Sequence, residues 1–422
     1  MRETDLAAYR ERAKAWLAAN LERRADRKAG SPFFAGLEER TAETIAPERA
    51  LQRRLYEAGY AGISWPREYG GQGLGPEYQR AFGQEAAGFV LPDFGVAGGT
   101  TFGVCAMTML AHASPDFLRR HIPRILAGDE LVAQFFSDPE AGSDLAGVRT
   151  QAVRRSDRWI VNGSKIWSSG AYYADYGMCL CRTNWDAPKH QGLTWFAVPT
   201  RAPGVTVQRI KQINGDAEFC QEFFDDVELT DDDIIGEIDG GWAVAQTMLL
   251  FERSGGAGSA VVGEASPARI APDLVELATA AHRLDAPQTR DLIARAHVDD
   301  VVRKALGARL GGLIAANPGR AANIASYGKL AAGVFDPIRA NLAMAVAGDR
   351  AIAWESASSP GAKAATGLLN SRFMAIAGGT CEMQRNSIGE RVLGLPREPS
   401  FDSRKPFREV LRDAQNWSGR VG

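Results

Sequence analysis

The stretch LVAQFFSDPEAGSDLAG, residues 131–147, marks the point where the sequence changes its periodicity. Before it, apolar residues such as Leu6, Tyr9 and Ala13 recur at helical spacing with charges between them, which predicts amphipathic helices. Within and after it, short β-prone runs alternate with turns. From Gly241 to about Arg391 the helical spacing returns. The sequence therefore predicts a mainly α chain with a central β domain.

This order divides the 422 residues into three domains and a tail. We expect an N-terminal helical domain over residues 1–130, a middle β-barrel over 131–238, a C-terminal helical bundle over 239–397 and a tail over 398–422. About seven short strands in ~100 residues are typical of a small barrel or sandwich. Within them, Asn162-Gly163 predicts a two-residue hairpin between the runs on either side.

Composition excludes several classes of protein. The chain carries 49 Lys and Arg against 51 Asp and Glu, a net charge of -2, which argues against binding to nucleic acid or an anionic membrane. No apolar run reaches ~18 residues, so we expect no membrane-spanning helix. The N-terminus lacks a signal-peptide pattern, and the five cysteines are scattered and odd in number. These features predict a cytoplasmic protein.

Familiar catalytic and metal motifs are missing from the sequence. It contains neither a Walker-type phosphate loop nor a G-x-S-x-G elbow, and its five histidines never fall at metal-ligand spacing with a carboxylate. Cys179-x-Cys181 lacks the second half of a zinc site, so we interpret it as a pair of buried strand cysteines. We therefore predict no metal site and disfavour serine and metal hydrolysis.

Three segments could contact a polar, planar ligand. They are residues 136–147, which follow the first strand; residues 163–170, with Trp167 beside hydroxyls; and residues 377–386, where two glycines precede Thr380. From the residues alone, each also has a structural interpretation. These are a capped turn, a core tryptophan before a serine turn, and a helix N-cap.

All three segments, in this order around a central β domain, resemble the acyl-CoA dehydrogenase family. Residues 65–71 and 222–227, followed by residues 236–242, resemble it too, and the resemblance covers roughly residues 5–397. It implies an N-terminal helical domain, a middle β-barrel and a C-terminal four-helix bundle. It also implies bound FAD, with the flavin between the β domain and the bundle.

The resemblance assigns binding residues motif by motif. Those implied to bind FAD are Phe135, Phe136, Ser137, Trp167, Ser168, Ser169, Thr380 and Glu382. Ser143 is implied to contact the pantetheine arm of an acyl-CoA thioester.

The catalytic base is the point where the chain departs from the commonest family pattern. Much of the family holds a Glu immediately before its Gly-Thr pair, but here that position is Gly378. A subgroup resembling isovaleryl- and long-chain acyl-CoA dehydrogenases instead uses a Glu on a bundle helix, directly before an Arg, which here is Glu252-Arg253. From the residues alone, Glu252 could also be a solvated helix residue paired with Arg253. The resemblance makes Glu252 the base, Gly378 the space opposite it, and Arg253 a substrate contact.

Two family segments that hold the adenine end of FAD are missing. Residues 280–285 and 344–361 occupy their places, and Arg283 and Arg290 are weak substitutes for the lost pyrophosphate contact. In this respect the chain resembles bacterial members with bulky substrates, some of which assemble from two different subunits.

The leading hypothesis is an FAD-dependent dehydrogenase that makes a trans-2-enoyl-CoA and passes electrons to an electron-transferring flavoprotein. We expect a homodimer or homotetramer. The alternatives are a subunit of a mixed oligomer that binds FAD poorly, and a flavin oxidase or monooxygenase of the same superfamily.

Overall fold

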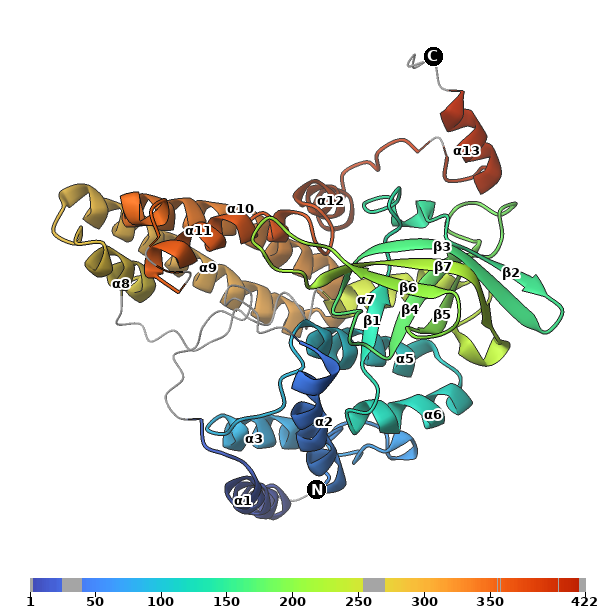
Figure 1. Cartoon of the computed structure of the whole chain (residues 1–422), viewed down its shortest axis with the longest axis horizontal. Coiled ribbons are helices and arrows are strands. Elements are labelled where there is room, and N and C mark those ends of the chain that lie inside the picture. Colours follow the sequence, from blue (N-terminus) through green and yellow to red (C-terminus); the bar gives the residue numbers. More distant parts are fainter. Residues whose placement is uncertain are drawn as a thin grey trace.

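The computed structural model describes residues 3–24, 40–252, 270–354, 356, 358–400 and 402–416. The strand domain lies beside both the N-terminal helices and the C-terminal bundle, on the right in Figure 1, and the last helix lies beside the strands. The first helices are α1 (Glu3–Asn20), α2 (Ala42–Glu57), α3 (Pro76–Ala86), α4 (Val96–Gly98), α5 (Ala106–His112) and α6 (Pro115–Leu126). A π-helical segment, Gly99–Cys105, joins α4 to α5.

The N-terminal helices form where the sequence periodicity predicts them. Tyr9, Ala13 and Leu17 of α1 are buried in one cluster with Tyr78 and Phe82 of α3. These positions repeat every three to four residues, so they form one apolar stripe along each helix. Burial of that stripe holds α1 onto α3.

The middle domain is one sheet of eight strands. These are β1 (Val132–Phe135), β2 (Gln151–Arg155), β3 (Arg158–Ser169), β4 (Tyr176–Arg182), β5 (Leu193–Pro199), β6 (Val205–Arg209), β7 (Phe219–Leu229) and β8 (Ile234–Ile235). Their order is β6-β7-β3-β2-β4-β5-β8, and β1 pairs with β4 in parallel.

The sheet is open, so the prediction of a closed barrel was wrong. Closure needs the two edge strands to pair with each other. Here β6 pairs with β7 and β8 pairs with β5, and the two edges do not meet. The β8 edge is instead covered by the N-terminal domain, because Ala113 at the end of α5 bridges to Ile235.

The predicted hairpin at Asn162-Gly163 was also wrong. Both residues lie inside the continuous strand β3, where Gly163 occupies a register shift opposite β7 and has φ of 137°. The real hairpin joins β2 to β3 through Ser156 and Asp157, and Ser156 has φ of 57°. Serine rarely adopts a positive φ in a tight turn, whereas Asn-Gly pairs often do. The sequence therefore favoured a hairpin turn at Asn162-Gly163 over one at Ser156.

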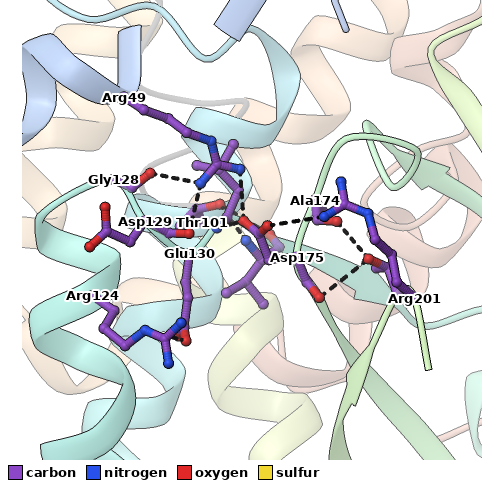
Figure 2. A network of polar contacts seen from close by, with 12 residues as sticks. Arg49, Thr101, Arg124, Gly128, Asp129, Glu130, Ala174, Asp175 and Arg201 are labelled. Atoms are coloured by element: carbon purple, nitrogen blue, oxygen red, sulfur yellow. Dashed lines mark hydrogen bonds and ion pairs between the residues drawn. The ribbon is translucent and has the colours of Figure 1, made fainter. Parts of the chain in front are cut away.

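A polar network fixes the N-terminal domain to the sheet (Figure 2). Arg49 of α2 donates to the carbonyls of Gly128 and Asp129 and pairs with Asp175 at 2.8 Å. The same Asp175 carboxylate accepts the Leu131 backbone N–H at 2.8 Å, just before β1. Because one carboxylate joins α2 and β1, the start of the sheet is tied to the helices that precede it.

The C-terminal domain is a helical bundle built on two long helices. Its helices are α7 (Gly241–Phe251), α8 (Pro272–Ala280), α9 (Pro287–Ala316), α10 (Ala321–Ala347), α11 (Pro360–Asn370) and α12 (Cys381–Ser387), and α13 (Phe407–Gln415) follows. The helical stretch is interrupted just before α12, where Gly378 and Gly379 both have positive φ, at 65° and 91°.

One described helix region, Ala321–Ala351, is long and apolar enough to cross a membrane by length and composition. The sequence reading predicted none. A bundle helix passes the same test, and α10 packs against α9, α11 and α12 while carrying Lys329, Asp336 and Arg339. Placement in a bundle therefore accounts for this helix.

Candidate active site

Glu252 lies where the bundle meets the N-terminal domain. It directly follows α7, keeps helical backbone angles and is half-buried. On the N-terminal side, burial raises the pKa of the Cys105 thiol, and the charge of Glu252 raises that pKa further. On the bundle side its Oε1 lies 3.1 Å from the point where a Cβ on Gly378 would stand.

The glycine turn opposite Glu252 is held from behind by a buried lysine. Lys329 of α10 is 8% exposed, and its ammonium donates to the carbonyl of Met374. Its Cε lies 3.2 Å from the ideal Cβ position of Gly378. The Glu252 carboxylate and the Cε methylene of Lys329 therefore both border the position that a Cβ on residue 378 would take.

Trp167 marks the face of the sheet that meets the bundle. It sits at a register shift between β3 and β7, has φ of 71° and is 57% exposed. Its ring packs edge-on against Phe219 of β7 at 6.1 Å, and Phe219 packs against Phe373 of the bundle at 5.8 Å. The bulge thus presents a large apolar surface beside the domain junction.

The other predicted sheet residues divide between the two faces of the sheet. Phe136, Ser137 and Ser169 are half-buried, whereas Phe135 and Ser168 are 0% and 1% exposed. The Phe135 ring packs in the core against Phe224, and the Ser168 hydroxyl donates to Glu222 at 2.9 Å. The side chains of Phe135 and Ser168 therefore point away from any ligand at the Trp167 face.

A buried polar cluster lies behind the two sheet segments. Lys165 is fully buried and donates to the Phe136 carbonyl at 2.8 Å and to Asp138 at 2.6 Å. Its cross-strand neighbour Glu222 is also fully buried, and Glu222 Oε1 has no hydrogen-bond partner among the described residues. Burial raises the pKa of Glu222 to about 8, against the opposing effect of the bond from Ser168. Burial thus favours the neutral carboxyl of Glu222 over its carboxylate in the folded protein.

Ser143 lies exposed in the turn after β1. Asp138 pins the near end of this turn, since its carboxylate accepts the backbone N–H of Thr150 at 2.8 Å and the Thr150 hydroxyl at 3.0 Å. At the far end, Asp144 pairs with Lys189 at 2.9 Å. The hydroxyl is therefore presented to solvent on a turn that is fixed at both ends.

On the bundle side, Thr380 caps α12 by accepting the Met383 backbone N–H at 3.3 Å. Glu382 is exposed and lies 3.6 Å from Arg385. Gln384 is 1% exposed and donates to the carbonyls of Gly378 and Gly379. The Gly-Gly turn is thus fixed both by Gln384 and, through Met374, by Lys329.

Three arginines complete the predicted set. Arg253 lies outside the described residues. Arg283 donates to the carbonyls of Ala345 and Val346 at the end of α10. Arg290 pairs with Asp285 at 3.0 Å and donates to the Leu284 carbonyl. Both arginines therefore hold bundle loops in this structure.

The sequence reasoning missed Lys329, Gln384 and Glu222. Lys329 stands four residues before the buried Gly333, so the two lie on the same helix face. A lysine on a buried helix face could have indicated a functional residue. Gln384 follows the Gly-Gly turn by five positions and carried no pattern of its own. Glu222 belongs to a quoted motif, but its burial depends on the register between β3 and β7.

Comparisons with known proteins agree across the whole chain. Models described as the acyl-CoA dehydrogenase N-terminal, middle and C-terminal domains match residues 7–129, 133–227 and 239–393. The acyl-CoA dehydrogenase IpdE1 of Mycobacterium tuberculosis is 35% identical over 410 residues, covering 93% of this chain and 99% of that protein.

Two solved structures are similar to this chain in fold, with sequence identities of 27% and 28%. One is described as the Tcur3481-Tcur3483 steroid ACAD, with a TM-score of 0.70 and 27% identity over 94% of this chain and 99% of that chain. The other is the ChsE4-ChsE5 complex from Mycobacterium tuberculosis, with a TM-score of 0.66 and 28% identity over 94% and 99%.

Proposed function

The chain belongs to the acyl-CoA dehydrogenase family of flavoprotein oxidoreductases, and on that premise we propose that it dehydrogenates an acyl-CoA thioester with Glu252 as the base. The observation that carries the proposal is the position of the Glu252 carboxylate. Its Oε1 lies 3.1 Å from the point where a Cβ on Gly378 would stand, so the glycine leaves the carboxylate uncovered on that side. A carboxylate in that position can take a proton from a substrate carbon.

The described residues fit a flavin on the Trp167 face of the sheet. The exposed indole offers a surface on which a flat ring can pack. Behind the Gly-Gly turn, Gln384 Oε1 is buried and has no hydrogen-bond partner among the described residues. A buried acceptor without a partner marks a place where a donor is expected. We therefore propose that Phe136, Ser137, Trp167, Ser169 and Thr380 line the FAD site.

In the proposed reaction, the pantetheine arm lies along Ser143 and the acyl chain extends between the sheet and the bundle. Glu252 removes the α-proton, and its carboxyl keeps that proton until product leaves. When bound, FAD would supply N5 as the acceptor of the hydride that leaves the β-carbon, and an electron-transferring flavoprotein would then take up the two electrons. Lys329 and Gln384 keep the Gly378 turn at a fixed distance from Glu252, which preserves the geometry of proton transfer.

We propose a bulky, ring-bearing acyl group as the substrate. Ala377 and Gly378 are the smallest side chains that could face the base, so they leave volume for a wide acyl chain. The similar Tcur3481-Tcur3483 protein is described as a steroid ACAD, which supports a ring-bearing substrate.

We also propose association with a second subunit of the same fold, through the α9–α10 face. Val298, Val301 and Val302 of α9 and Ile338 of α10 are 42–59% exposed. Exposed apolar patches of this kind mark interaction sites. Arg283 and Arg290 are engaged within the bundle, so the adenine end of FAD would need contacts from elsewhere. Two of the similar structures are two-component complexes, which favours a mixed oligomer.

An anaerobic titration of the FAD-loaded protein tests the chemistry. The panel contains butyryl-, isovaleryl- and palmitoyl-CoA, cyclohexanecarbonyl-CoA and the CoA thioester of a steroid carboxylic acid. We expect ring-bearing thioesters to bleach the flavin band. Glu252→Gln should slow bleaching by ~10³-fold or more while FAD stays bound. Glu237→Gln, an exposed residue just before α7, is the matched control and should leave the rate unchanged.

Two outcomes would overturn the proposal. Full bleaching by Glu252→Gln would remove Glu252 from the reaction. A yellow protein that no thioester bleaches, but that consumes oxygen with another substrate, would establish an oxidase instead. A colourless protein that gains flavin only with a co-expressed homologue would establish the mixed oligomer.

A further inference from the structure

The C-terminal strap, residues 402–416, is bound to the strand domain and not to the bundle from which it emerges (Figure 1). Phe407 at the start of α13 is 2% exposed. Its ring stacks on Trp185 at 5.7 Å, and the guanidinium of Arg182 lies 4.1 Å from its centroid. The strap therefore has a buried anchor in the β4–β5 region.

Backbone bonds add to this anchor. The Phe407 N–H donates to the Ala187 carbonyl at 3.0 Å, and the Arg408 N–H donates to the Trp185 carbonyl at 3.1 Å. The Arg408 side chain pairs with Asp186 at 2.6 Å. These contacts run along one loop, so the strap follows the β4–β5 loop as an added segment.

The same loop carries the lysine that holds the Ser143 turn. Lys189 is 8% exposed, and its Nζ lies 2.6 Å from Asp402 of the strap and 2.9 Å from Asp144 of the turn. The bond from Lys189 holds the pKa of Asp402 below its usual value. One ammonium thus joins the strap to the residue that follows Ser143.

Arg182 makes the second connection between strap and turn. It is fully buried, donates to the Ala146 carbonyl in the turn and to the Lys189 carbonyl, and lies against Phe407. A buried guanidinium needs its donors satisfied, so loss of any of these neighbours disturbs the others. The strap, Arg182, Lys189 and the turn consequently form one connected unit.

We propose that the C-terminal strap is a positioning element for substrate, which fixes the Ser143 turn through Lys189 and so sets the affinity for the coenzyme A portion. This rests on the proposed function, because it uses Ser143 as the pantetheine contact. The strap reaches neither Glu252 nor the Trp167 face in any contact of the described residues. It should therefore change binding and leave the chemical step alone.

The test compares three point variants of the full-length, FAD-loaded protein with the unmodified protein, and adds one truncated chain. Asp402→Asn removes the charge that the strap offers to Lys189, and Asp402→Glu restores it. Asp413→Asn is the matched control, since it removes the strap's separate pair with Lys405 at 2.8 Å, which is remote from the turn. The measurements are the Kd of free coenzyme A by calorimetry, and KM and kcat with the best thioester of the panel.

We expect Asp402→Asn to weaken coenzyme A binding about 5-fold and to raise KM similarly, with kcat within twofold. Asp402→Glu and Asp413→Asn should behave as the unmodified protein. Hydrogen exchange of amides 140–147 should accelerate in Asp402→Asn alone. A chain ending at Pro399 should show a larger loss of affinity, and circular dichroism and FAD content would verify that it folds.

The outcomes separate this inference from the proposed function. If the unmodified protein binds coenzyme A and is bleached by a thioester while Asp402→Asn binds equally well, the positioning role is overturned and the function stands. A fall in kcat without a change in Kd or KM would also overturn it. If the unmodified protein neither binds coenzyme A nor is bleached by any thioester, both proposals fail.

Discussion

The substitution Glu222→Gln should stabilise the protein, and more strongly as the pH rises. Glu222 is fully buried, and burial raises its pKa from 4.5 to about 8. Between these values the folded state holds a proton that the unfolded state releases, so the free energy of unfolding falls as pH increases. Each unit of pKa shift corresponds to about 1.36 kcal/mol, so above pH 8 the free energy of unfolding would be lower by ~5 kcal/mol than at low pH. The amide of the variant cannot ionise, so the variant avoids this loss.

The expected gain at pH 7.5 is about 3 kcal/mol, because a pKa of about 8 corresponds to about 4 kcal/mol at that pH and water penetration relieves part of it. At pH 5 the gain should be under about 1 kcal/mol. Urea unfolding followed by tryptophan fluorescence at pH 5, 6.5 and 8 measures the difference. Glu228→Gln, an exposed residue on the same strand, is the control. Parallel stability curves for the Glu222 variant and the unmodified protein would refute a neutral, buried Glu222.

Two further substitutions test the sheet. Gly177→Ala would place a Cβ inside the van der Waals surface of the Phe135 ring, so it should lower the thermal midpoint and reduce the stability by about 3 kcal/mol. As a control, a Cβ at Gly83 in α3 meets no atom within 4 Å, so Gly83→Ala should raise the stability by ~0.5–1 kcal/mol. Equal midpoints for the two variants would contradict the close packing of β1 on β4. Trp167→Ala should lower the fraction of purified protein that retains FAD, measured as the ratio of flavin to protein absorbance, while far-UV circular dichroism stays unchanged. Retention at the unmodified level would exclude the indole from the flavin site.

The domain order could be read from periodicity, because each domain repeats one period over many residues. The burial of Cys179 and Cys181 followed in the same way, since residues two apart on a strand share a face. The closed barrel could not be settled from the sequence. Closure depends on whether β6 and β8 meet, and Ala113, which is far from Ile235 in the sequence, occupies the β8 edge.

The site was predicted unevenly, for a physical reason. A sequence motif identifies which segment contributes to the site. The direction in which each of its side chains points depends on the local strand register. A bulge at Trp167 turns that side chain outward and leaves Ser168 inside with Glu222. Contacts between distant segments were the least accessible. No local sequence pattern predicts that Lys189 pairs with both Asp144 and Asp402. These ion pairs form only when the strap packs against the β4–β5 loop.

The geometry around Glu252 favours a glycine at position 378. Any side chain at 378 would begin 3.1 Å from Glu252 Oε1 and 3.2 Å from Lys329 Cε. A Glu there would bring two carboxylates into one small volume, where the pKa of one must rise and one of them would be protonated at neutral pH. It would also carry a positive φ, at 65°, that non-glycine residues rarely adopt. The chain therefore departs from the commonest family pattern at a position where a side chain would crowd Glu252.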